Sequence, residues 1–225
     1  MTEELNQVSE ATEDFEDLFA DLEDTVRKQI PGGYYAHTDQ CGSTDLFTYK
    51  TPKAEHNATV YLPYGYNAQD KQTRYPVLYL MHGGGGNCSS YMGLAKCPNR
   101  LVNIIDHAIQ NGDFVPLIIV CPNDTGAFQK ELRDYLIPAI DESFNTIADR
   151  EHRAFGGFSM GAVATWKIFQ YDLDLVKYFV PMSGDSWVFT TTGGSSQPEK
   201  TAALVSKAKF IEQYSKTDYY IFAAT

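Results

Sequence analysis

The stretch "RAFGGFSMGAVATW", residues 153–166, indicates the fold most directly. Residues 153–158 form a short apolar segment of strand length, and the segment that begins at 160 has the composition of a helix. Between them, Ser159 occupies the centre of a G-x-S-x-G pattern, whose glycines avoid collisions in a sharp strand-to-helix turn. The pattern predicts a nucleophile elbow with Ser159 as the nucleophile. The alternative is a serine that only caps the following helix.

Strand-like and helix-like segments alternate on both sides of this turn. The candidate strands are 46–50, 56–63, 75–82, 115–122, 153–158, 178–183 and 218–224, and the candidate helices are 100–112, 128–148, 160–171 and 201–214. Pro138 is expected to bend or interrupt the second helix. The alternation predicts an α/β fold, with a mostly parallel sheet and helices on both faces.

A run of four glycines follows the candidate strand at 75–82, in the sequence His82-Gly83-Gly84-Gly85-Gly86. A serine that attacks an ester creates an oxyanion, which needs preorganised N–H donors. We expect the backbone N–H groups of Gly84 and Met160 to be these donors, and His82 to shape the turn rather than act as a base. A plain flexible loop is the alternative, and a phosphate loop is disfavoured because no G-K-[S/T] follows.

The charge of the chain is concentrated at its N-terminus. The net charge of the 225 residues is −11, and ten acidic residues fall within 1–25, whereas the other 19 nearly balance 18 basic residues. The nearly neutral body argues against a nucleic-acid partner. We expect residues 1–30 to be an acidic, helical extension, packed on the domain or solvated, and 31–225 to be the catalytic domain.

Composition also limits the cofactors and the compartment. The sequence has no apolar run of membrane-spanning length, and "MTEELNQVSE" lacks the features of a signal peptide. The four cysteines show no metal-ligand spacing, so neither a metal nor an organic cofactor is expected. Cys88 and Cys97 are either bridged in an oxidising compartment or free. Oligomeric state is left open.

The chain resembles the α/β-hydrolase esterases of carbohydrate esterase family 1, the feruloyl and acetyl xylan esterases, with esterase D-like proteins as relatives. The segments that carry the resemblance are "ATVYLPYGYN", "YPVLYLMHGGGGN", "ELRDYLIPAIDESF", "RAFGGFSMGAVATW" and "YFVPMSGDSW". The resemblance implies Ser159 as nucleophile, Gly84 and Met160 as the oxyanion hole, and a secreted or extracellular location. It also puts "MSGDSW" beside the cleft, with Asp185 and Trp187 as candidate substrate-binding residues.

The rest of the catalytic triad is harder to find. In this fold the acid and the histidine follow the serine along the chain. All five histidines precede Ser159, and the usual acid position follows the candidate strand at 218–224; Asp185 is a topological substitute. We therefore expect the 225 residues to be a truncated piece that lacks the last strand, the last helix and the histidine loop. Such a piece is expected to be poorly soluble and weakly active.

The leading functional hypothesis is a serine carboxylesterase that hydrolyses feruloyl or acetyl esters on plant cell-wall xylan through an acyl-enzyme. Its partner would be feruloylated or acetylated xylan or oligosaccharide, with no nucleic acid and no membrane involved. Two alternatives stay open. One is an esterase D-like thioesterase of the S-formylglutathione hydrolase type, and the other is a non-catalytic binding module with the hydrolase fold.

Overall fold

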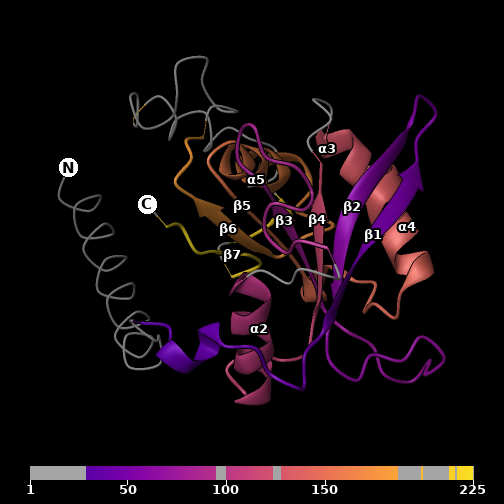
Figure 1. Cartoon of the computed structure of the whole chain (residues 1–225). Helices are drawn as coiled ribbons and strands as arrows, with labels where there is room; N and C mark the ends of the chain where they lie inside the picture. Colours follow the sequence, from indigo (N-terminus) through magenta and orange to yellow (C-terminus); the bar gives the residue numbers. More distant parts are fainter. Residues whose placement is uncertain are drawn as a thin grey trace.

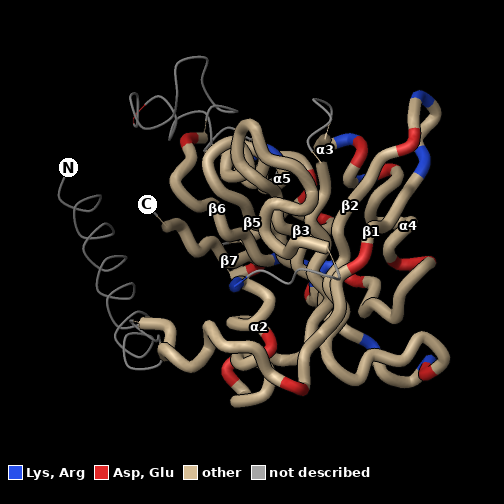
Figure 2. Tube along the Cα trace, viewed as in Figure 1, with Lys and Arg blue, Asp and Glu red and all other residues tan. Residues whose placement is uncertain are grey.

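The structure of the chain is a computed structural model that describes residues 29–94, 100–123, 128–186, 199, 213–215 and 217–224. The expected acidic extension, residues 1–30, lies almost entirely outside the described residues. Trp187, Cys97 and most of the helix expected at 201–214 also lie outside them. Acidic and basic residues are interspersed along the described chain (Figure 2), which agrees with a body of nearly balanced charge.

The described strands form one seven-stranded sheet in the order β1-β2-β4-β3-β5-β6-β7 (Figure 1). The strands are β1 (Ser43–Lys50), β2 (Glu55–Leu62), β3 (Val77–Met81), β4 (Ile118–Pro122), β5 (Arg153–Phe158), β6 (Tyr178–Met182) and β7 (Tyr220–Ile221). The pairs β1–β2 and β2–β4 are antiparallel, and all pairs from β4 to β7 are parallel. The carboxyl ends of the parallel strands therefore meet at one edge, where α/β sheets place their ligands.

Helices cover both faces of this sheet, as the sequence predicts. The helical elements are η1 (Gly32–Tyr35), α2 (Arg100–Gln110), α3 (Phe128–Glu131), the π-helical segment η2 (Leu132–Leu136), α4 (Ile137–Ser143), η3 (Arg150–His152) and α5 (Met160–Tyr171). On one face, Tyr79 and Met81 of β3 belong to a buried cluster with α3, η2, α4 and α5. On the other face, Leu80 packs with Val102 and Ile105 of α2. Successive side chains of one strand thus serve opposite halves of the core.

The helix expected at 128–148 is shorter and less regular than its pattern suggests. It ends at Ser143, because the next residues pair with the segment before β3: Tyr75 N–H donates to Asn145 O, and Ile147 N–H donates to Tyr75 O, both at 2.9 Å. The predicted end at 148 was therefore wrong. Pro138 lies in the first turn of α4, directly after η2, so the expected irregularity takes the form of a π-helical turn.

The strand expected at 218–224 is also shorter than predicted. Only Tyr220 and Ile221 form β7, and an isolated bridge joins Met182 to Ala224. Hydrogen bonds from Phe222 N–H to Phe179 O and from Ala224 N–H to Pro181 O nevertheless keep this segment alongside β6. The segment lies beside β6, as the alternation of strands and helices implied, but only two of its residues form a regular strand.

A buried ion pair fixes α5 against η2. The Asp172 carboxylate, which is fully buried at the end of α5, accepts a hydrogen bond from Arg133 Nε at 2.6 Å. Gln129 Nε2 donates to both oxygens of the same carboxylate, at 2.9 and 2.7 Å. Burial raises the pKa of Asp172, and the hydrogen bonds from Gln129 and Arg133 oppose that shift. The network holds one wall of the candidate site in place.

We expect Arg133→Met to lower the free energy of unfolding by about 2 to 3 kcal/mol, because it leaves a buried carboxylate without its cation. Lys130→Met is a matched control from the neighbouring turn, since the Lys130 ammonium pairs with Asp134 on the surface and its side chain is 76% exposed. Such exposed pairs contribute less than about 1 kcal/mol. Denaturant unfolding of the two variants measures the difference, and equal changes would contradict this account.

Candidate active site

The backbone at Ser159 has the conformation that a nucleophile elbow requires. Ser159 lies between β5 and α5 with φ 55° and ψ −113°. Residues other than glycine rarely adopt a backbone conformation with positive φ. Its N–H donates to Met182 O on β6 at 2.9 Å, which anchors the turn to the sheet. The Ser159 side chain makes no capping hydrogen bond to α5 and is partly exposed. The alternative of a helix-capping serine is therefore wrong.

Three glycines allow the chain to pack closely around this turn. A Cβ atom on Gly157 would lie 2.6 Å from the Met81 carbonyl oxygen, and one on Gly161 would lie 2.2 Å from the same oxygen. A Cβ atom on Gly184 would lie 2.4 Å from the Cβ of Ala162. The G-x-S-x-G pattern points to the first two glycines. The third belongs to "MSGDSW", and sequence reasoning did not connect it with the turn.

The glycine loop after β3 lies beside Ser159. Parallel pairing of β3 and β5 sets Met81 opposite Gly157, so the residues that follow each strand are neighbours. A Cβ atom on Gly84 would lie 3.4 Å from Met160 Cγ. Met160 is the first residue of α5, where a backbone N–H has no partner within the helix and the helix dipole favours negative charge. The structure thus brings Ser159, Gly84 and Met160 together.

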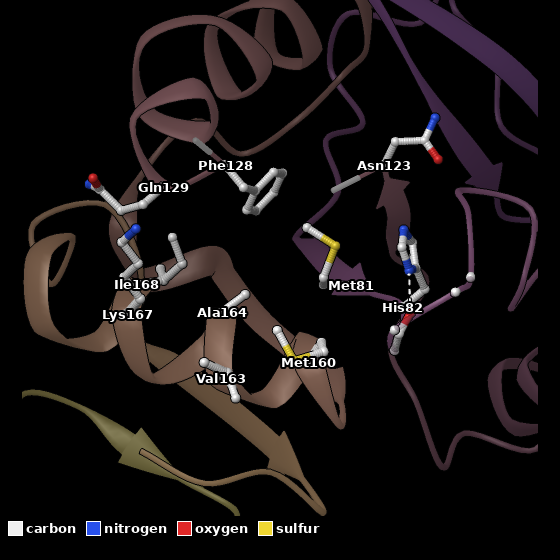
Figure 3. Close-up of a pocket in the computed structure, with 14 residues that line it drawn as sticks. Met81, His82, Asn123, Phe128, Gln129, Met160, Val163, Ala164, Lys167 and Ile168 are labelled. Atoms are coloured by element: carbon white, nitrogen blue, oxygen red, sulfur yellow. Dashed lines mark hydrogen bonds between the residues drawn. The ribbon is translucent and has the colours of Figure 1, made fainter. Parts of the chain in front are cut away.

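The His82 side chain folds back onto the glycine loop (Figure 3). Its Nδ1 atom lies 2.7 Å from Gly83 O, which also accepts a hydrogen bond from Gly86 N–H at 3.1 Å. A Cβ atom on Gly86 would lie 2.9 Å from the His82 Nδ1 atom, so the ring and the loop are in close contact. This arrangement agrees with the expectation that His82 shapes the turn.

The other four histidines are attached to other parts of the fold. His152, in η3, contacts Asp149 at 2.7 Å and precedes the six residues of β5, so it lies about 20 Å from Ser159. His56 on β2 lies 3.8 Å from a Glu131 oxygen. His107 stacks on Tyr34 beside η1. His37 lines a separate pocket of about 280 Å³ with Cys41 and Asp106.

The segment after β6 approaches the elbow from the other side. Ser183 has φ 48°, and its N–H donates to Ala224 O at 2.7 Å. The carbonyl of Gly184 accepts a hydrogen bond from Trp166 Nε1 at 3.3 Å, so this segment rests on α5. Asp185 follows directly and is partly buried. Trp187 lies outside the described residues.

A cavity of about 590 Å³ opens between the glycine loop, α3 and α5 (Figure 3). Its lining residues are Met81, His82, Gly83, Gly84, Gly85, Gly86, Asn123, Phe128, Gln129, Met160, Val163, Ala164, Lys167 and Ile168. Sequence reasoning missed Asn123, Phe128, Gln129 and Lys167. The helical spacing from Met160 to Lys167 was the available signal, because residues seven apart lie on one helix face.

The described residues contain neither a metal-binding cluster nor a membrane-spanning helix. Within the ranges given above, no group of three His, Cys, Asp or Glu side chains is arranged to hold a metal ion. No helix in that part of the chain is long and apolar enough to cross a membrane. The Cys41, Cys88 and Cys121 thiols are free, so Cys88 is not bridged in this structure; Cys97 lies outside the described residues.

Comparison with known proteins decides the family. The family described as "Putative esterase" matches residues 50–209. The chain belongs to this esterase family. The chain is 36% identical over 214 residues to Endo-1,4-beta-xylanase Y of Acetivibrio thermocellus, a match that covers 88% of the chain and 19% of the relative. It is also 38% identical over 147 residues to an Endo-1,4-beta-xylanase/feruloyl esterase of Xylanibacter ruminicola, covering 58% of the chain and 20% of the relative.

Solved structures agree with this assignment. A mutant of the feruloyl esterase module from Clostridium thermocellum, complexed with sinapinate, is 34% identical with a TM-score of 0.75; the match covers 88% of this chain and 72% of that chain. S-formylglutathione hydrolase from Staphylococcus aureus is 20% identical with a TM-score of 0.57; the match covers 84% of this chain and 78% of that chain and shows the fold alone. The chain thus has the α/β-hydrolase fold of carbohydrate esterase family 1, as the resemblance of its motifs implied. It spans about a fifth of the length of the curated relatives it matches.

Proposed function

We propose that the protein is a serine carboxylesterase that removes feruloyl or acetyl groups from xylan, with Ser159 as its nucleophile. The observation that carries the proposal is the conformation of Ser159. This residue has φ 55°, and its side chain makes no capping hydrogen bond to α5. The turn is possible because three closely packed glycines flank it. Strained backbone of this kind persists only where surrounding structure enforces it, and it is common at catalytic residues.

In the proposed reaction, Ser159 Oγ attacks the ester carbonyl carbon and forms a C–O bond while a base takes the hydroxyl proton. Negative charge moves to the carbonyl oxygen, where the N–H groups of Gly84 and Met160 stabilise it. The sugar alcohol then leaves with a proton, and water hydrolyses the acyl-enzyme to release the acid. That the base is a histidine later in the chain stays a prediction.

The choice of substrate is supported by the relatives and by the cavity. One curated relative is named a xylanase/feruloyl esterase, and the solved feruloyl esterase module is complexed with sinapinate, an aromatic acid. The cavity beside Gly84 and Met160 is lined by apolar side chains such as Phe128 and Ile168, which suit the aromatic or ring portions of such a substrate. Asp185 and Trp187 remain proposed substrate-binding residues.

Substrate comparison tests the proposal. The full-length protein is expected to release ferulate from a feruloylated oligosaccharide or acetate from acetylated xylan, and to act at least about 100-fold less well, in kcat/KM, on S-formylglutathione. A higher kcat/KM on the thioester would favour the thioesterase alternative instead.

Covalent labelling tests the nucleophile separately. A fluorophosphonate probe is expected to modify Ser159, because an activated serine in an elbow reacts irreversibly with such reagents. Mass spectrometry of the labelled peptide identifies the modified residue, and Ser43→Ala, an exposed serine on β1, is a control that should still be labelled. A correctly folded protein that is not labelled would support the non-catalytic binding module.

A further inference from the structure

We propose that Lys167 forms a carboxylate-binding subsite at the far end of the active-site cavity. The protein would then prefer ester substrates that carry a second, negatively charged group about 10 Å from the ester carbonyl. This inference rests on the proposed esterase function and specifies the substrates that the same site takes. Three observations support it: the position of Lys167, the lack of an ion-pair partner for its ammonium group among the described residues, and the apolar side chains around it.

Lys167 lies on the cavity face of α5, at a defined distance from the elbow. Met160, Val163 and Lys167 all line the cavity and share one face of the helix, since they are spaced by three and four residues. Two helical turns separate Met160 from Lys167, a rise of about 10 Å. Figure 3 shows Lys167 and Gln129 at one end of the cavity, and Met160 and His82 toward the other.

Among the described residues, no carboxylate pairs with the positive charge of Lys167. Its side chain is half-buried, and it makes no ion pair and no hydrogen bond with any residue that the structure describes. The carboxylate at the end of the same helix, Asp172, already binds Arg133 and Gln129. Removing a cation from water without a counter-ion is unfavourable, so an anionic ligand would relieve that penalty.

The surroundings of Lys167 strengthen its attraction for an anion. Phe128, Val163 and Ile168 line the cavity with apolar surface, which lowers the local dielectric and makes charge pairs stronger than in water. An ammonium group donates hydrogen bonds and accepts none, and the carboxylate of the proposed ligand supplies acceptor oxygens together with the opposite charge. The carboxylate can belong to the sugar part of the substrate, as a uronic acid, or to the acyl part, as a second carboxyl group.

Two matched pairs of substrates test the subsite in the full-length protein. The first pair is a feruloyl ester of a neutral oligosaccharide and the same ester on an oligosaccharide bearing a uronic acid. The second is an aromatic diacid mono-methyl ester with its distal carboxylate free, and the corresponding diester. We expect the charged member of one pair to be favoured about tenfold in kcat/KM at low salt, and the pair that shows the preference identifies the source of the carboxylate.

Charge variants at position 167 assign the preference. Lys167→Met keeps the approximate length of the side chain and should abolish the preference, measured as the ratio of kcat/KM for the charged substrate to kcat/KM for the neutral one. Lys167→Arg should retain most of the preference, because it retains the charge. Lys50→Met, on the exposed part of β1, is a control that should change neither substrate. An unchanged ratio in Lys167→Met, or no preference in either pair, would overturn the proposal.

Binding measurements separate failure of the subsite from failure of the esterase function. Calorimetry with Ser159→Ala compares the charged and neutral reaction products without turnover. If the wild-type protein hydrolyses no ester but Ser159→Ala binds the charged product more tightly in a Lys167-dependent manner, the esterase function fails and the subsite stands. If esters are hydrolysed and neither rate nor affinity depends on Lys167, the subsite fails and the esterase function stands.

Discussion

Replacing Ser159 with alanine is expected to lower kcat/KM for ester hydrolysis by about 10⁴-fold or more, leaving only the catalysis that oxyanion donors and binding supply. The substitution removes the proposed attacking oxygen, and no acyl-enzyme can form without it. Methyl ferulate hydrolysis by the full-length protein measures the loss. Binding of ferulate should persist, because the cavity beside Met160 is lined by residues that the substitution leaves unchanged.

Two comparisons make this result specific. Ser43→Ala removes an exposed hydroxyl from β1 and should leave kcat/KM within about twofold, as surface substitutions usually do. Far-ultraviolet circular dichroism of Ser159→Ala should match that of the wild-type protein. Retention of more than about a tenth of the activity by a folded Ser159→Ala protein would exclude the proposed nucleophile.

Gly161→Ala is expected to have the largest effect on stability, at least about 3 kcal/mol in the free energy of unfolding, with loss of activity. The added Cβ atom would lie 2.2 Å from Met81 O and 2.9 Å from His82 O, and both obstacles are backbone atoms. A flexible side chain cannot rotate away to make room, so either α5 or the end of β3 has to move. That movement would separate Met160 from Gly84 and displace Ser159.

Gly33→Ala is the matched control, because a Cβ atom there meets nothing within 4 Å. Its midpoint of denaturation should change little. Thermal and denaturant unfolding of both variants, followed by fluorophosphonate labelling of the folded fraction, measures stability and the elbow together. A Gly161→Ala protein as stable and as reactive as Gly33→Ala would contradict the close packing described for the turn.

Local patterns were sufficient to predict most of the sheet. The apolar runs of β3 and β4 have the composition of strands buried on both faces, and the structure buries both, with successive residues facing opposite clusters. The errors arose where distant residues compete for backbone hydrogen bonds. Residues 145–147 continue a helical pattern, yet Tyr75 binds their backbone instead. That contact joins segments about 70 residues apart, and no local pattern contains it.

Local motifs predicted part of the site, and the residues they missed depend on contacts between distant segments. Ser159, Gly84 and Met160 follow from two motifs and the rule that parallel strands end at one edge, and the structure brings them together. Gly184 and Lys167 were not predicted as parts of the site, since their roles depend on which atoms of α5 and β6 come near them. The expectation that an acid and a histidine lie beyond Thr225 stays a prediction.

The hydrogen bond from the Ser159 N–H to Met182 O helps to orient the Ser159 hydroxyl before a substrate binds. This bond ties the strained residue to β6, while the glycine packing fixes it against β3, so folding itself orients the hydroxyl before any ester arrives. Encounter with a substrate then needs little rearrangement of the main chain, and the entropy of alignment is already lost when the domain forms. Rigid and flexible esters should accordingly differ in reactivity mainly through their own internal freedom.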